Sequence, residues 1–198
     1  FSAGSAQTGP NSGNLKVFLP LIIGEKPVPV GPVGGTFTSI AFDPGENDNI
    51  YAGHFGSGVY KSFDQGNTWY RKNQGLGDLT IQSLATHPTN SNIVFAGTYD
   101  AGLYKSYNGG ESWQASNGSV LNNHIIYDIE IDPSNPLRMF VVSRIRGNLT
   151  GYLSRSMDGG ASWTVLFTGA SFSTPDYFYD VDIDPISPNV VFLTAHEH

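Results

Sequence analysis

The sequence predicts an all-β fold made of repeated four-stranded antiparallel units, and two observations support this. The 198 residues include 24 Gly and 12 Pro but only 14% charged residues, a composition typical of short strands joined by tight turns. Three similar eight-residue segments end in Trp69, Trp113 and Trp163, so 44 residues separate the first two tryptophans and 50 the last two. A recurrence of this length indicates a repeat architecture.

Each repeated unit is predicted to contain four short strands. A step from Asp or His to Pro closes the first strand, and the hydrophobic segments that follow it are typical of further strands. First strands are expected at 38–42, 82–86, 127–131 and 179–183, and the fourth unit stops after a second strand at 190–194. The units therefore span 36–76, 79–118 and 125–169, with a partial unit at 177–198.

A unit of this size is typical of one blade of a β-propeller, in which each sheet buries both faces against its neighbours around a central axis. Propellers contain about four to eight blades, and the chain carries about three and a half. The sequence therefore predicts closure in one of three ways: by further chain after His198, by another copy, or by a strand from its own N-terminus.

The first 35 residues differ in composition from the repeats. Residues 1–14 are rich in Gly, Ser and Asn and begin without Met, so we expect a flexible segment left by a removed leader, in a secreted or cell-envelope protein. Residues 15–35 combine a strand candidate at 15–23, which Pro20 limits to a sheet edge, with a Pro/Gly linker. This segment predicts a homo-oligomer or filament formed by strand donation, and the alternative is a stalk to the envelope.

The eight-residue segments share Ser, Asp or Asn, Gly and Trp at their first, third, fifth and eighth positions. The third residue is expected to accept hydrogen bonds from its own turn, the Gly to adopt a positive φ, and the Trp to enter the core. Asn108 keeps the acceptor oxygen but loses the charge. The shared residues are Ser62, Asp64, Gly66 and Trp69; Ser106, Asn108, Gly110 and Trp113; and Ser156, Asp158, Gly160 and Trp163.

This pattern resembles the Asp-box, or BNR, repeat of sialidases, xyloglucanase-type glycoside hydrolases and sortilin-like proteins. The resemblance implies a β-propeller whose boxes are structural and lie away from any substrate. The arginine motif of sialidases is missing from the chain. The first repeat is more similar to the xyloglucanase type, whose catalytic Asp follows a Tyr-Ala pair. Here His54 and Phe55 hold the nearest positions, and in the second repeat Asp100 lies one place beyond Tyr99, so the sequence favours a binding or structural module over an enzyme.

Carboxylates on two first strands support the alternative hypothesis, a fragment of a glycoside hydrolase. Period-two alternation places Asp128 and Glu130 on one side of a strand, and Asp180 and Asp182 at matching positions in the next unit. Two carboxylates about 5 to 9 Å apart can act as acid and base in glycoside cleavage, and such a group also suits Ca²⁺. The simpler interpretation is an acidic channel wall without a cofactor. The five His match no zinc pattern.

Ligand binding is expected on one face of the propeller. The third unit has an insertion at 144–151, and the segments 117–124 and 169–179 after fourth strands are long. Loops of both kinds emerge opposite the Asp-boxes, and binding residues concentrate on such loops. Aromatic rings beside Asp and Arg suit a glycan or a protein ligand, although ordinary surface loops have the same composition. The predicted binding residues are His54, Phe55, Tyr99, Asp100, Arg144, Arg146, Asp176 and Tyr177.

Composition excludes several other classes. The net charge of −7 repels a phosphate backbone, so nucleic acid is not an expected partner. The chain has no cysteine, which rules out a disulfide framework. The longest apolar run, 17–23, has seven residues and includes a proline, whereas a membrane-spanning helix needs about twenty.

Overall fold

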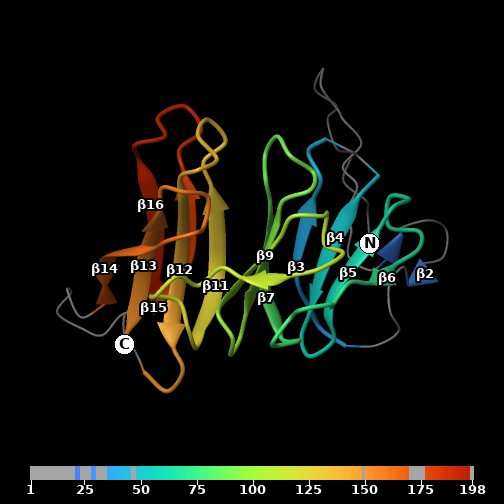
Figure 1. Cartoon of the computed structure of the whole chain (residues 1–198), viewed down its shortest axis with the longest axis horizontal. Helices are drawn as coiled ribbons and strands as arrows, with labels where there is room; N and C mark the ends of the chain where they lie inside the picture. The colour runs from blue at the N-terminus through green and yellow to red at the C-terminus, as the bar shows by residue number, and fades with distance from the viewer. Residues whose placement is uncertain are drawn as a thin grey trace, which may run out of the picture.

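The computed structural model describes residues 21–22, 28–29, 35–45, 48–148, 150–169 and 177–196. Within these ranges the chain forms three four-stranded antiparallel sheets and one two-stranded sheet in succession, with a further short pair near the N-terminus. The sheets follow one another along an arc (Figure 1). This arrangement confirms the predicted all-β propeller of about three and a half blades.

The three complete blades have the same strand order, from the inner strand outward. Blade 1 contains β3 (Phe37–Phe42), β4 (Ile50–His54), β5 (Gly58–Ser62) and β6 (Tyr70–Arg71). Blade 2 contains β7 (Ile81–Thr86), β8 (Val94–Thr98), β9 (Leu103–Ser106) and β10 (Gln114–Ala115). Blade 3 contains β11 (His124–Ile131), β12 (Met139–Ile145), β13 (Gly151–Ser156) and β14 (Thr164–Thr168).

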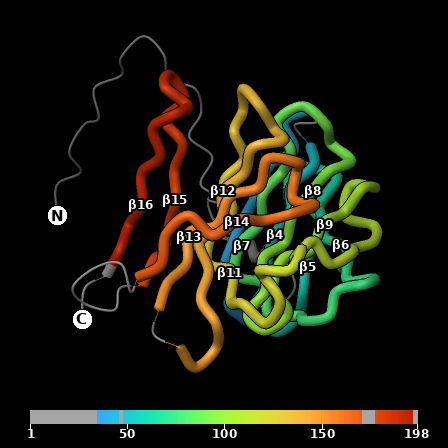
Figure 2. The backbone as a smooth tube through the Cα atoms, turned by 60° about the vertical axis from the view of Figure 1, so that its left-hand side comes forward, coloured from blue at the N-terminus to red at the C-terminus, as the bar shows by residue number. Residues whose placement is uncertain are grey.

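The last sheet is half a blade. It consists of β15 (Tyr177–Ile183) and β16 (Val191–His196), which stand at one end of the arc (Figure 2). Near the N-terminus, β1 (Leu21–Ile22) pairs with β2 (Val28–Pro29) of the linker. The rest of the predicted donor strand lies outside the described residues, so strand donation stays a prediction.

Every inner strand carries a β-bulge at the same place, five residues before the Asp or His of the turn. The bulge makes β11 and β15 longer than predicted, because pairing continues on its far side. The bulged residue also leaves the regular alternation of side chains between the two faces of the sheet. The bulged residues are Thr38, Gln82, Tyr127 and Tyr179.

The hydrophobic core lies between blades. One cluster joins Tyr51 and Val59 of blade 1 to Leu84 of blade 2, and a second joins Phe95 of blade 2 to Ile129 of blade 3. A third joins blade 3 to the half-blade. Stability therefore depends on stacking neighbours, as in other repeat folds.

The Asp-boxes form the predicted local networks. In box 1, Ser62 Oγ donates to Asp64 Oδ1, and the amide of Thr68 donates to the same oxygen at 2.8 Å. Gly66 has φ 89°, in the region that favours glycine. In box 3, hydrogen bonds from Ser162 and Ser156 lower the pKa of Asp158 to about 2.

Each later box is tied to the preceding blade through its tryptophan side chain and through one of its backbone carbonyls. The indole N–H of Trp113 donates to the carbonyl of Lys72, and that of Trp163 to the carbonyl of Ser116, both at 2.8 Å. In the reverse direction, Lys61 Nζ donates to the carbonyl of Gly109 in the next box, and Lys105 does the same to Gly159. Trp69, in the first blade, donates instead to Gly66 of its own box.

An asparagine after the fourth strand completes the blade and was missed by the sequence analysis. Asn73 accepts from the amide of Val59 and donates to the carbonyl of Ser57. Asn117 makes the equivalent bonds to Leu103 and Ala101. The shared spacing of four residues after the box tryptophan was a visible signal for this role.

The inter-blade role of the tryptophans gives a stability prediction. Trp163→Phe removes a hydrogen bond to the preceding blade and leaves a small cavity at a site that is 6% exposed, so we expect a loss of about 2–3 kcal/mol in unfolding free energy. Trp69→Phe breaks only a hydrogen bond within its own turn, so we expect a smaller loss of about 1 kcal/mol in unfolding free energy. Urea unfolding measures both, and equal losses would contradict the inter-blade role.

Candidate functional site

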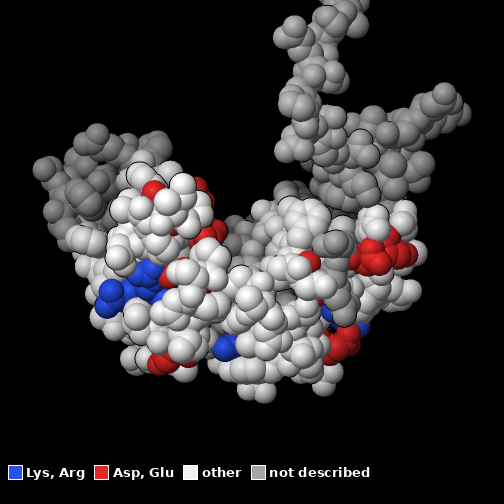
Figure 3. Space-filling view, turned by 90° about the horizontal axis from the view of Figure 1, so that it is seen from above, with Lys and Arg blue, Asp and Glu red and all other residues white. Residues whose placement is uncertain are grey.

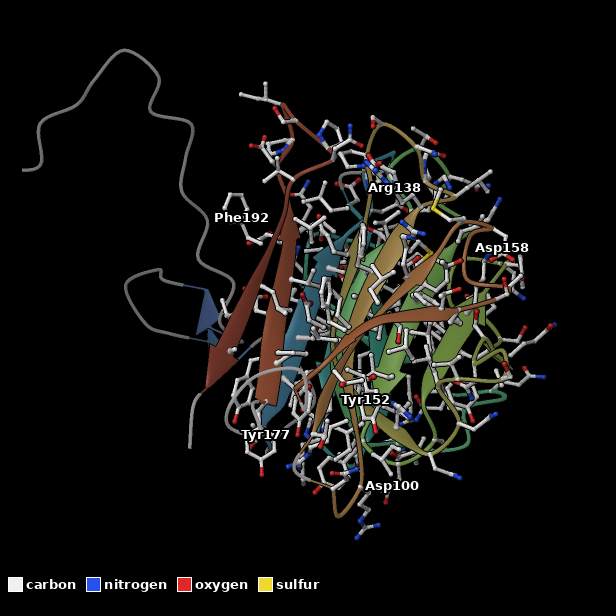
Figure 4. All side chains as sticks on the ribbon, turned by 90° about the vertical axis from the view of Figure 1, so that its left-hand side faces the viewer. Asp100, Arg138, Tyr152, Asp158, Tyr177 and Phe192 are labelled. Atoms are coloured by element: carbon white, nitrogen blue, oxygen red, sulfur yellow. The ribbon has the colours of Figure 1, made fainter. Side chains whose placement is uncertain are left out.

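The two ends of the blades differ in what they present. At one end, each Asp-box packs against the turn between the first two strands, for example through Gly109 N and the carbonyl of Asn92. At the other end, the loops between second and third strands contact the segments leading into first strands, for example through Tyr99 N and the carbonyl of Thr80. Figure 4 shows Asp158 at the Asp-box end, with Asp100 and Tyr177 at the opposite end. The opposite end is the loop face.

One cluster on the loop face joins blades 1, 2 and 3. The rings of Phe55 and Tyr99 meet edge to face with centroids 6.5 Å apart. The guanidinium of Arg146 lies 5.8 Å from the centroid of the Tyr99 ring and forms a 2.7 Å ion pair with Asp100. Phe55 is 53% exposed. The structure thus brings together four of the predicted binding residues.

A second cluster lies where blade 3 meets the half-blade. The guanidinium of Arg144 is 4.8 Å from the ring centroid of Tyr177 and 5.7 Å from that of Tyr127. Tyr179 packs against both tyrosines. The Nε atom of Arg144 is buried without a hydrogen-bond partner among the described residues. Sequence reasoning missed Tyr127 and Tyr179, because the bulge that places them is not visible in a period-two pattern.

The prediction that His54 and Tyr177 are displayed on this face is wrong. His54 is 6% exposed and packs against Phe37 and Tyr60 inside blade 1. Tyr177 is 7% exposed and lies beneath Arg144. Both residues sit inside the strand ends rather than in the loops, so neighbouring side chains cover them. Asp176 lies outside the described residues.

The carboxylates of the two inner strands follow the predicted alternation. Ile129 and Val181 point into the core, while Asp128 and Glu130 are half-buried and Asp180 and Asp182 are exposed. Figure 3 shows the arc hollowed on one side, with acidic atoms gathered beside the hollow. Within the described ranges, no three or more His, Asp or Glu side chains are placed to hold a metal ion.

One of these carboxylates has a structural role. Asp128 Oδ2 accepts a 3.0 Å hydrogen bond from the amide of Val181, which joins the inner strands of blade 3 and the half-blade. The hydroxyl of Ser39 accepts the equivalent bond from the amide of Leu84 between blades 1 and 2. Position 128 therefore repeats an inter-blade contact, with a carboxylate in place of a hydroxyl.

Burial shifts the proton equilibria of two of the carboxyl groups. Burial raises the pKa of Asp128 to about 6, although the amides of Val181 and Ile129 stabilise its charge, and Asp180 adds repulsion. Burial also raises the pKa of Glu130 to about 7, with repulsion from Asp128 as the next cause. Glu130 is therefore about half protonated near neutral pH, which is the condition for a general acid.

The turn residues at the ends of the inner strands are structural, as predicted. Burial alone would raise the pKa of Asp132, but hydrogen bonds from Ser134 and Arg138 outweigh it and lower the pKa. The amides of Ser187 and Ile186 lower the pKa of Asp184. His87 accepts from the amide of Thr89 at the equivalent turn.

Comparison with known families identifies the repeat. The model of the sortilin/Vps10 family, described as sortilin, neurotensin receptor 3, matches residues 57–195. The chain belongs to the sortilin family. No curated protein matches the chain closely enough to count as a relative, and the part of the chain that the structure describes contains no helix able to cross a membrane.

Solved structures with the same fold include carbohydrate-active enzymes. An ancestral GH74 enzyme superposes with a TM-score of 0.71 at 27% identity, over 83% of this chain and 22% of that one. The match to the GH74 xyloglucanase from Xanthomonas campestris (TM-score 0.57, 19% identity) covers 73% of this chain and 25% of the xyloglucanase chain. The match to YCF48 from Cyanidioschyzon merolae (TM-score 0.56, 14% identity) covers 82% of this chain and 48% of the YCF48 chain. This sortilin-family chain thus spans about a quarter of the GH74 structures.

The raised carboxyl pKa values give a pH prediction. Between about pH 4 and 7 the native state holds more protons on Asp128 and Glu130 than the unfolded chain does, so the free energy of unfolding falls as pH rises through this window. Between pH 5 and 8, the free energy of unfolding should fall by about 1–2 kcal/mol less in the double variant Asp128→Asn, Glu130→Gln than in the wild type, a figure reduced for solvent screening of these partly exposed groups.

Urea unfolding at pH 5, 6, 7 and 8 measures this slope. Asp158→Asn is the matched control, because a carboxyl with a pKa of about 2 does not titrate in this range. Equal slopes for the wild type and the double variant would contradict the prediction.

Proposed function

We propose that this domain is a binding or structural module that recognises a glycan or a protein through its loop face. The observation that carries the proposal is Arg144, whose guanidinium lies 4.8 Å from the ring centroid of Tyr177 and 5.7 Å from that of Tyr127, beside the exposed ring of Tyr179. A guanidinium held against aromatic rings is pre-organised to bind a planar or anionic group.

The neighbouring cluster supports the same proposal. The partly exposed rings of Phe55 and Tyr99 offer apolar faces next to the Arg146–Asp100 ion pair. Aromatic rings beside Arg are typical of the residues that contribute most to interface affinity, and sugar rings stack on such faces in the same way. We place the domain outside the cell or at its envelope, where glycans and receptor ligands are accessible.

A binding screen tests this proposal. The probes are cello-, xyloglucan- and laminarin-oligosaccharides, sialyllactose and a displayed twelve-residue peptide library. We expect one class to bind the wild type, and Arg144→Met combined with Tyr99→Ala to weaken that binding at least tenfold. Tyr107→Ala is the matched control, because this ring is 59% exposed but belongs to an Asp-box at the opposite end. No binding by any probe, or equal losses in both variants, would overturn the proposal.

A second candidate is a glycoside hydrolase fragment that uses Asp128, Glu130, Asp180 and Asp182. The specific observation in its favour is the pKa of Glu130, raised to about 7 by burial and by the other carboxylates. The likeness to the ancestral GH74 enzyme is a further argument. Glu130 would serve as the acid, and one of the exposed carboxylates as its partner.

Incubation with β-glucans, xyloglucan and sialosides tests the enzymatic alternative. If the alternative is correct, new reducing ends appear, and Glu130→Gln lowers the rate at least a hundredfold while the folded state persists. The rate should also fall above pH 7, as the acid loses its proton. Product formation that is unchanged in Glu130→Gln, or no product from any substrate, would eliminate it.

A further inference from the structure

A small pocket lies between blades 2 and 3 at the Asp-box end of the molecule. Its volume is about 100 Å³, and its lining includes Lys105, Gln114 and Ser116 of blade 2 together with Gly160 and Ala161 of blade 3. The last two residues belong to the same Asp-box as Asp158, which marks this end in Figure 4. The pocket therefore lies at a junction between two complete blades, at the opposite end from the loop face.

Lys105 is the one charged side chain among the residues that line the pocket. Its Nζ atom donates a 2.8 Å hydrogen bond to the carbonyl of Gly159 and lies 5.2 Å from the centroid of the Phe95 ring. An ammonium group has three donors, and none of the ion pairs within the described ranges includes Lys105. The lining thus holds a positive charge in a fixed position without supplying a carboxylate to face it.

The same positions at the preceding junction contain a carboxylate. Counted from the box tryptophans, Lys72 is equivalent to Ser116, and Glu111 is equivalent to Ala161. Lys72 and Glu111 form a 2.6 Å ion pair that joins blades 1 and 2. Serine and alanine are too short to form such a pair, and between blades 2 and 3 these positions line the open pocket.

The other lysine of the junction is present in both places. Lys61 donates to the carbonyl of Gly109, as Lys105 does to that of Gly159. The junction of blades 1 and 2 therefore combines two lysines with one carboxylate. The pocket between blades 2 and 3 keeps one lysine and lacks the carboxylate.

An exposed apolar side chain borders the lysine. A Cβ atom on Gly159 would lie 3.7 Å from Lys105 Nζ and 3.5 Å from Leu137 Cδ2, so both side chains lie beside this glycine. Leu137 is 57% exposed. Protein interfaces combine apolar contacts with complementary charges, so a protein partner uses this surface more fully than a free small anion does.

We propose that the pocket binds the carboxylate of a Glu or Asp side chain of a partner protein, in the position that Glu111 supplies from within the chain at the preceding junction. The carboxylate accepts hydrogen bonds from the ammonium group of Lys105, and an apolar residue beside it packs on Leu137. Charge-assisted hydrogen bonds of this kind are stronger than neutral ones. The site does not involve the loop face and is independent of the function proposed for that face.

Two blocked pentapeptides test the proposal on the isotope-labelled full chain. One has a central glutamate between two leucines, and the other has glutamine in its place. Amide chemical shifts follow the titration. We expect the glutamate peptide to shift the amides of Gly118, Gly160 and Ala161 at millimolar concentrations, and the glutamine peptide and acetate to bind at least tenfold more weakly.

Variants of the pocket test its chemistry. Ala161→Glu supplies a carboxylate from the chain itself at an exposed position, so it should abolish binding while circular dichroism shows an intact fold. Gln114→Glu, also at an exposed position, should weaken binding at least fivefold by charge repulsion. Gln74→Glu is the matched control, because it adds the same charge at an exposed position of the preceding junction, and it should leave binding unchanged.

The equivalence of the two junctions gives a further test. Glu111→Ala removes the carboxylate that pairs with Lys72, so the glutamate peptide should then shift the amides of Lys72 and Gly110 as a second site. Absence of shifts at the pocket up to about 20 mM glutamate peptide, shifts confined to the loop face, or equal affinity for acetate or the glutamine peptide would overturn the proposal. Unchanged binding in Ala161→Glu, or no second site in Glu111→Ala, would also contradict it.

Discussion

The fold depends on the packing of successive sheets, because each hydrophobic cluster of the described residues joins one sheet to the next. The Asp-boxes enforce that contact at close range. A Cβ atom on Gly110 would lie 3.1 Å from the Tyr51 ring, and one on Gly160 would lie 3.0 Å from Phe95. A side chain at either position would require the facing ring to shift, and both glycines also have a positive φ. The tryptophan and lysine hydrogen bonds across the same junctions also join successive blades.

Because the Asp-box ends are occupied with this packing, the loop face is free to vary. Blade 3 carries an insertion there, and its Arg144 and Arg146 reach toward the half-blade and blade 2 respectively. The rigid strands hold the arginines and tyrosines in place, which lowers the entropy lost on binding a ligand. The same division between a repeated scaffold and variable loops explains why one fold serves both sortilin-family proteins and GH74 enzymes.

The inner-strand carboxylates show how a structural position can acquire chemical properties. The position holds Ser39 in blade 1 and Asp128 in blade 3, and both accept an amide hydrogen bond from the next blade. The Asp128 carboxyl has a raised pKa at this half-buried site, because burial disfavours its charge more than the hydrogen bonds favour it. Structural and catalytic interpretations of Asp128 are therefore compatible, and the activity and stability of its variants distinguish them.

The sequence by itself determined the repeat, the four-stranded blade and the local networks of the Asp-boxes. These features depend on short-range spacing, so the recurring tryptophans and the Asp-Pro or His-Pro turns were sufficient evidence. Only the tertiary structure decided which residues are accessible. His54 and Tyr177 are adjacent to loops in sequence but are covered by Phe37 and Arg144, and the bulges bring Tyr127 against Tyr179. Burial and inter-blade contact depend on residues that are far apart in the sequence, such as Arg144 and Tyr177 on successive blades, and the spacing within one repeat carries no information about them.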